Sequence, residues 1–167
     1  PECGSKYIKY FGTGTQKIEQ EIKRVFPDAR VLRMDRDTTA KKHSHEDIIR
    51  AFSNREADIL IGTQMVAKGH DFPKVTLVGA VLADSSLYVS DFRAAERTFS
   101  LLTQVIGRAG RAGARGLAVI QTYSPKNEII RLACEQDYDK FYEGEIQLRK
   151  AAVFPPFCTF KSSISET

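Results

Sequence analysis

The sequence predicts an α/β fold with a doubly wound, mainly parallel sheet and helices on both faces. Short apolar, β-branched runs, typical of buried strands, alternate along the chain with segments whose apolar residues repeat at helical spacing. This alternation is typical of βαβ units, whose strands run parallel. The 167 residues suit one domain with a sizeable core, and a composition of 42% hydrophobic and 28% charged residues is ordinary for a globular protein.

The first 62 residues are expected to hold three strands and two helices. An aromatic and β-branched run predicts a strand at 7–11, and Thr15 is expected to cap a helix over 16–26. The apolar stripe of that helix comprises Ile18, Ile22, Val25 and Phe26. A strand at 31–34, a helix from Ser44 to about residue 52 and a strand at 57–62 follow. The last is expected to be buried on both faces.

The rest of the chain continues the pattern. A second doubly buried strand is expected at 75–82, followed by a long amphipathic helix over 91–107. Its core stripe comprises Phe92, Ala95, Phe99, Leu102 and Ile106. A strand at 117–121 and helices at 128–135 and 137–150 close the domain.

Ligands of parallel sheets bind beyond the carboxyl ends of the strands, where the loops starting at Gly12, Gly62, Asp84 and Thr122 are expected to gather. In the first loop, Thr13, Gly14 and Thr15 offer hydroxyls, backbone N–H groups and a helix start, which suit an anion. No Gly-Lys-Ser/Thr follows, so this is not a P-loop. A plain capped helix is the alternative.

The loop after the strand at 57–62 is also rich in binding groups. Thr63 and Gln64 are expected to start a short helix whose N–H groups suit a backbone phosphate. Lys68 adds a cation, Gly69 admits a close ligand, and Asp71 can accept hydrogen bonds from a ribose hydroxyl. A connecting loop with a surface lysine is the alternative.

The most informative stretch is 104–111. If the helix continues through it, Gln104, Arg108 and Arg111 share one face, with glycines between them that let another surface approach. Two guanidinium groups beside small residues suit a polyphosphate. Five arginines and one acid lie between residues 93 and 115, so this segment matches the whole chain's formal charge of +4. Arginines that merely offset the helix dipole are the alternative.

The cysteines and the hydropathy exclude other classes. Cys3, Cys134 and Cys158 show no metal spacing, and an odd count argues against a disulfide framework. Cys3-Gly4 reads like half of a zinc knuckle, and one cysteine cannot supply the roughly four ligands of zinc. No apolar run suits a membrane span and no signal peptide is evident, so an intracellular location without membrane contact is expected.

Together, the loops resemble a known family. Thr63-Gln64-Met65 with Lys68, Gly69 and Asp71 resembles motif V of superfamily 2 helicases, and Gln104 to Arg111 resembles motif VI. The first strand with Gly12 to Gln16 resembles motif IV. Within that superfamily, four further segments are similar to primosomal replication-restart helicases: Cys3-Gly4-Ser5, Ala83 to Leu87, Ser90 to Arg97 and Phe154 to Phe157.

The resemblance implies a RecA-like (P-loop NTPase-type) helicase C-terminal lobe. By it, residues 1–6 are the remnant of a zinc-binding insertion, 7–153 the second RecA-like lobe, and 154–167 the start of a following domain or a frayed tail. Cys3 would then be one ligand of a Zn²⁺ site that is incomplete here.

The implied function is that of the second motor lobe of an ATP-dependent 3′–5′ DNA helicase in replication restart and primosome assembly. Arg111 would be the arginine finger, with Arg108 beside it and Gln104 orienting water or coupling phosphate to DNA. Gly69 and Asp71 would meet the nucleotide. The strand's phosphates would be held by Thr13, Gly14, Thr15, Thr63, Gln64 and Lys68.

The implied cofactors are ATP and Mg²⁺, held mostly by a first lobe, because neither a Walker A lysine nor an Asp-Glu magnesium motif occurs here. The chain alone is therefore not expected to turn over ATP. The implied partners are single-stranded or forked DNA, the first helicase lobe, primosome proteins and single-strand-binding protein, in the bacterial cytoplasm at the nucleoid. The alternatives are a non-catalytic nucleic-acid-binding module, or this lobe from a branch-migration translocase or an RNA helicase.

Overall fold

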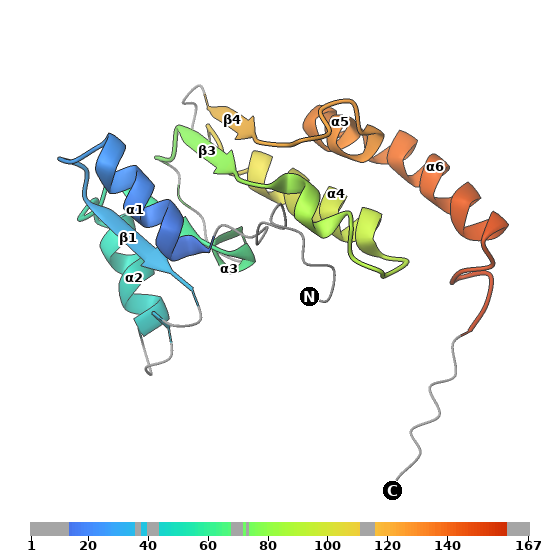
Figure 1. The fold of residues 1–167 in the computed structure, drawn as a ribbon, viewed down its shortest axis with the longest axis horizontal. Helices are drawn as coiled ribbons and strands as arrows, with labels where there is room; N and C mark the ends of the chain where they lie inside the picture. Colours follow the sequence, from blue (N-terminus) through green and yellow to red (C-terminus); the bar gives the residue numbers. More distant parts are fainter. Residues whose placement is uncertain are drawn as a thin grey trace, which may run out of the picture. The chain divides into compact units, whose positions relative to one another are not determined.

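The computed structural model describes residues 14–35, 38–39, 44–67, 72, 74–110 and 116–159. The chain forms two compact units, residues 1–70 and 71–167, and each is described by itself (Figure 1). The strand expected at 7–11 lies outside the described residues.

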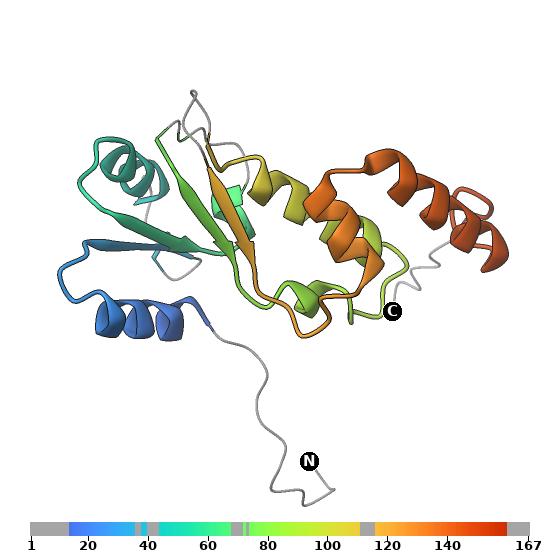
Figure 2. The same ribbon diagram turned by 90° about the horizontal axis from the view of Figure 1, so that it is seen from above.

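The first unit is built on a parallel strand pair. β1 (Val31–Met34) pairs with β2 (Ile59–Gly62) in the register Val31 to Ile59 through Met34 to Gly62. α1 (Thr15–Val25) contacts both strands and α2 (Ser44–Ser53) contacts β1. The two helices lie on opposite sides of the pair (Figure 2). A one-turn helix, α3 (Gln64–Ala67), follows β2. The expected β1–α2–β2 unit is thus confirmed.

Burial in this unit is lighter than predicted. Met34, Ala57 and Ile61 are its buried apolar residues among those described, and α1 has none that is fully buried. Ile18 and Ile22 are half-buried, whereas Val25 and Phe26, expected on the same stripe, are 59% and 56% exposed. The stripe ends early because the helix stops at Val25 and the chain turns away through Pro27.

The second unit places a parallel pair against helices. β3 (Leu77–Ala80) pairs with β4 (Leu117–Ile120), and a 3₁₀ turn, η1 (Ala83–Ser86), leads from β3 to α4 (Ala94–Ile106). α4 packs against β3, η1 and α5 (Glu128–Glu135), and α6 (Tyr138–Ala151) packs against α5. The core of the unit comprises Ala83, Phe99, Leu102, Ile130, Leu132, Ala133 and Phe141.

The prediction that the strand at 75–82 is buried on both faces is wrong for the side chains of β3. In both strands, half-buried residues alternate with exposed ones, and Leu77 and Leu117 are each about 60% exposed. An apolar run therefore marks a strand without fixing how many of its faces are covered.

Capping residues set the two C-terminal helices. The Asn127 side chain accepts hydrogen bonds from the N–H groups of Ile129 and Ile130, and Asp137 accepts one from Lys140. Gln136 joins the helices in the left-handed region (φ 55°). These bonds satisfy donors that a helix start otherwise leaves without partners. α5 begins at the predicted residue, and α6 begins one residue later than predicted, with Asp137 as its N-cap.

Candidate functional site

The loop after β2 is held by close backbone packing. A Cβ atom on Gly62 would collide with the Val66 side chain and lie 2.7 Å from the Met34 carbonyl oxygen. Only glycine therefore lets α3 fold back so tightly on the strand ends. Thr63 and Gln64, both exposed, stand at this turn, and the short helix predicted to start there is confirmed.

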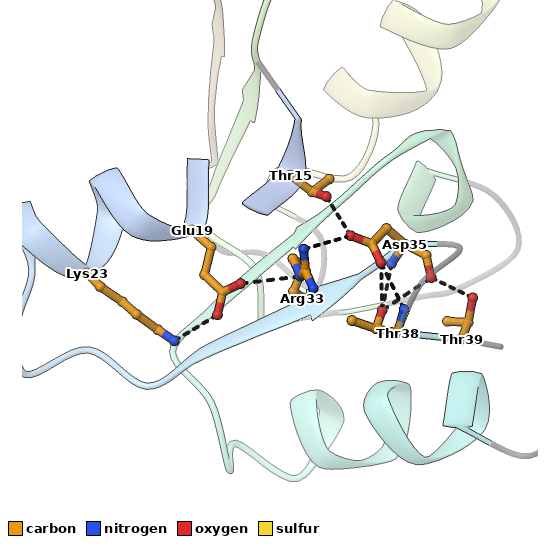
Figure 3. Close-up of polar contacts among 7 residues, drawn as sticks. All are labelled: Thr15, Glu19, Lys23, Arg33, Asp35, Thr38 and Thr39. Carbon is orange, nitrogen blue, oxygen red and sulfur yellow. Dashed lines mark hydrogen bonds and ion pairs between the residues drawn. The ribbon is translucent and has the colours of Figure 1, made fainter. Parts of the chain in front are cut away.

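The start of α1 differs from the prediction. Gly14 is the N-cap, with an extended backbone, and no side chain caps the helix. Thr15, expected as the cap, is the first helical residue, and its hydroxyl donates to the Asp35 carboxylate at 2.5 Å. The prediction that Thr15 caps the helix is wrong because a carboxylate 20 residues further along the chain binds this hydroxyl (Figure 3).

Asp35 lies at the carboxyl end of β1 and is 6% exposed. Besides Thr15, it accepts hydrogen bonds from the backbone N–H and the hydroxyl of Thr38, at 2.9 and 3.1 Å. The bond from Thr15, followed by the Thr38 N–H, holds the pKa of this carboxyl below its usual range. Asp35 is therefore ionised at neutral pH. Sequence reasoning assigned it no role, although a polar residue directly after a strand was a signal for one.

A second buried carboxylate holds the loops after β3 and β4. Asp84, 5% exposed, accepts hydrogen bonds from the Thr122 hydroxyl at 2.7 Å and the Tyr123 N–H at 2.8 Å. Burial raises the pKa of Asp84, but these bonds outweigh it and the net effect lowers the pKa. The loops expected to start at Asp84 and Thr122 do meet, at the carboxyl ends of neighbouring strands.

The arginine-rich turn follows the end of α4. Gln104 is exposed in the last turn, and its side-chain NH₂ donates to the Ser100 hydroxyl at 3.1 Å. The helix ends at Ile106 with Gly107 as the C-cap, one residue short of the predicted end. Arg108 therefore lies beyond the helix, so Gln104 and Arg108 do not share a continuing helical face.

Gly110 turns the chain back toward the strands. Its N–H donates to the Val75 carbonyl at 3.1 Å, and its φ of 73° lies in the left-handed region that favours glycine. The described end of this turn is thus tied to the backbone just before β3. Six predicted site residues lie outside the described ones: Cys3, Thr13, Lys68, Gly69, Asp71 and Arg111.

Within the described ranges, no three His, Cys, Asp or Glu residues gather closely enough to hold a metal ion. No helix among them is long and apolar enough to cross a membrane.

The motifs agree with a known family. A model of the helicase conserved C-terminal domain matches residues 5–113, which include the loops after β2 and α4. The chain belongs to this helicase family. The predicted RecA-like α/β fold is confirmed, since the family, the parallel strands and the flanking helices agree.

Individual relatives show which members of this helicase family the chain resembles. The chain is 54% identical over 157 residues to the replication restart protein PriA of Bacillus subtilis (strain 168), covering 94% of the chain and 20% of that protein. It is 46% identical over 172 residues to PriA of Chlamydia trachomatis, covering 99% and 23%, and 46% identical over 157 residues to PriA of Synechocystis, covering 94% and 19%. This helicase domain therefore spans about a fifth of the length of these relatives, and its resemblance to replication-restart helicases is confirmed.

Proposed function

We propose that this chain is the second motor lobe of an ATP-dependent 3′–5′ DNA helicase that restarts replication and assembles the primosome. The observation that carries the proposal is the joint match to the helicase C-terminal family and, over nearly the whole chain, to replication restart proteins. The activity belongs to the longer protein in which such a lobe works, because the nucleotide site of these motors lies between two lobes.

On the nucleotide side, the described end of α4 supports the proposal. Gln104 is exposed in the last turn of α4, and Gly107 and Gly110 keep the following turn free of bulk. Arg111 would stabilise charge on the transferred phosphoryl group, with Arg108 beside it and Gln104 orienting the attacking water. Gly69 and Asp71 would meet the nucleotide. ATP, as its Mg²⁺ complex, would supply the hydrolysable phosphoanhydride bond.

On the DNA side, the exposed Thr63 and Gln64 lie at a turn whose close packing fixes the backbone. Together with Lys68 and the segment 13–15 they would hold the phosphates of the tracking strand. Contacts of this kind fix register and carry no sequence preference. Single-stranded or forked DNA is therefore the proposed substrate.

The remaining partners follow from the same role. A first lobe would supply the Walker A lysine and the magnesium-binding acids, so this chain alone is expected to hydrolyse no ATP. Primosome proteins and single-strand-binding protein would meet the longer helicase at forks in the nucleoid. Cys3 would be one of about four ligands of a Zn²⁺ site completed by residues beyond this chain.

The deciding experiment is single-stranded-DNA-stimulated ATP hydrolysis by the full-length helicase carrying this lobe. Arg111→Ala is compared with wild type and with Arg131→Ala, a control that removes an exposed arginine paired with Glu135 on α5. We expect Arg111→Ala to lower kcat by about 10³-fold or more with ATP and DNA binding retained. Unchanged turnover would remove Arg111 from the chemistry.

The same assay tests the alternatives. Stimulation by RNA and not by DNA would indicate an RNA helicase, and stimulation by branched DNA and not by single strands would indicate a branch-migration translocase. A full-length protein without a Walker A loop would indicate a non-catalytic binding module. Turnover by the purified 167-residue chain, sensitive to Arg111→Ala, would contradict the two-lobe site.

A further inference from the structure

A cluster of polar side chains joins the start of α1 to the carboxyl end of β1 (Figure 3). Its central bond runs from the Thr15 hydroxyl to Asp35 Oδ2 at 2.5 Å. The bond links residues 20 positions apart, so it fixes where α1 begins relative to the strand and not merely how a local turn folds. A short bond from a hydroxyl to a carboxylate is among the stronger hydrogen bonds in proteins.

Asp35 is itself held firmly by its own turn. Its backbone N–H donates to the Thr38 hydroxyl at 2.9 Å, and its carbonyl accepts from the Thr39 hydroxyl at 2.6 Å. With the bond from the Thr38 N–H to its carboxylate, these contacts leave the side chain one orientation, toward Thr15.

Among the described residues, the positive and negative charges in the ion pairs that include this carboxylate balance. Arg33 lies 3.3 Å from Asp35 and 3.2 Å from Glu19, and Lys23 lies 2.7 Å from Glu19. Two acids and two bases thus form one chain of ion pairs along α1 and β1. An anion arriving at the start of α1 meets a cluster with no net charge, so the negative charge of Asp35 presents little barrier to a phosphate.

The bond to Asp35 limits what Thr15 can do. A threonine hydroxyl has one proton, and here the carboxylate accepts it. While this bond holds, Thr15 cannot donate its hydroxyl to a phosphate oxygen. Its contribution to DNA binding must then come from its backbone, in the helix turn that follows the N-cap residue Gly14 and that no side chain caps.

We propose that Asp35 is a positioning residue for DNA binding: it holds the Thr15 hydroxyl and so fixes the first turn of α1 for backbone contact with a strand phosphate. The inference rests on the proposed function, because the phosphate contact belongs to the helicase site. It adds to that site a residue that never touches DNA and changes the role expected of the Thr15 side chain.

The test uses the full-length helicase and measures two quantities separately. One is the concentration of single-stranded DNA that half-maximally stimulates ATP hydrolysis; the other is kcat at saturating DNA. The variants are Asp35→Asn, Thr15→Val, Thr15→Ser and the double variant of Asp35→Asn with Thr15→Val. The controls are Asp47→Asn, which removes an exposed carboxylate of α2, and Thr76→Val, which alters an exposed threonine.

We expect Asp35→Asn and Thr15→Val each to raise the half-maximal DNA concentration about 10-fold, the scale of one hydrogen bond to a charged group, with kcat within about twofold. The double variant should be no weaker than either single one, since both changes remove the same charge-assisted bond from the Thr15 hydroxyl to the Asp35 carboxylate. Thr15→Ser keeps the hydroxyl and should bind DNA like wild type, as should both controls.

Three results would overturn the inference. They are wild-type DNA dependence in Asp35→Asn, multiplicative effects in the double variant, and failure of Thr15→Ser to retain binding while Thr15→Val folds. If Asp35→Asn does not fold, the comparison of Thr15→Val with Thr15→Ser decides alone. Absence of DNA stimulation in the wild type would instead contradict the proposed function, so the two failures are distinguishable.

Discussion

Gly62→Ala is expected to destabilise the first unit and displace the loop that carries Thr63 and Gln64. The added Cβ would collide with the Val66 side chain and stand 2.7 Å from the Met34 carbonyl oxygen, a distance that side-chain carbons do not tolerate. The carbonyl belongs to the backbone of β1, which is paired with β2, so it yields less readily than a side chain. Overpacking of this kind costs about 1–3 kcal/mol, and we expect the upper half of that range because backbone is one of the two obstacles.

The assay is urea unfolding of the chain followed by far-ultraviolet circular dichroism. Gly79→Ala is the matched control: Gly79 also lies in a strand, and its added Cβ would meet nothing within 4 Å. The double variant of Gly62→Ala with Val66→Ala should regain part of the loss, since it removes one obstacle and leaves the carbonyl. Equal unfolding midpoints for Gly62→Ala and Gly79→Ala would refute this reasoning.

Three further predictions concern the second unit, each measured by urea unfolding. Phe99→Ala should cost about 3–5 kcal/mol, because its buried ring stacks on Phe141 with centroids 4.2 Å apart, whereas Tyr142→Ala, at an exposed position, should cost far less. Asp84→Asn should destabilise the chain at pH 7. Folding lowers the pKa of Asp84, so its contribution to the free energy of unfolding is full above about pH 4 and fades as the pH falls further. The difference in unfolding free energy between Asp84→Asn and wild type should therefore shrink below that pH, and a difference that does not change with pH would contradict this reasoning. Asn127→Ala should cost about 0.5–2 kcal/mol and Asn127→Gly only a few tenths, because the Asn127 side chain caps α5; an unfolding midpoint of Asn127→Ala equal to that of the wild type would contradict this.

Local patterns predicted most of the elements well. The start of α2 at Ser44, the bounds of α5 and the stripe through Phe99 and Leu102 all follow from nearby residues. Errors arose where a distant residue decides the outcome. Thr15 was predicted to cap α1, and Asp35, brought close by β1, takes its hydroxyl instead.

The candidate functional site could be predicted from the sequence to about the same extent as the helices and strands. Glycines and arginines mark the turn after α4, but its direction depends on the bond from Gly110 to Val75, some 35 residues away. The sequence marked Asp84 as the start of a loop, but not its bonds to Thr122 and Tyr123, because these partners belong to a loop that only parallel pairing brings near. Sequence patterns thus miss residues, such as Asp84, that position the loops of a site through hydrogen bonds formed only in the fold.

The two ends of α4 are tied to different parts of the second unit. Its 13 residues span about 20 Å, from the Gln104 end to a start where Glu96 pairs with Arg149 at 2.8 Å and Phe92 packs against Phe154. Arg149 also donates to the Pro155 carbonyl. Because α4 is one continuous helix, joined near its start to Arg149 and through Arg149 to Pro155, we expect a displacement at the arginine-rich turn to move these contacts as well. Spin labels at Ser100 and Phe157 should then keep one separation with and without nucleotide.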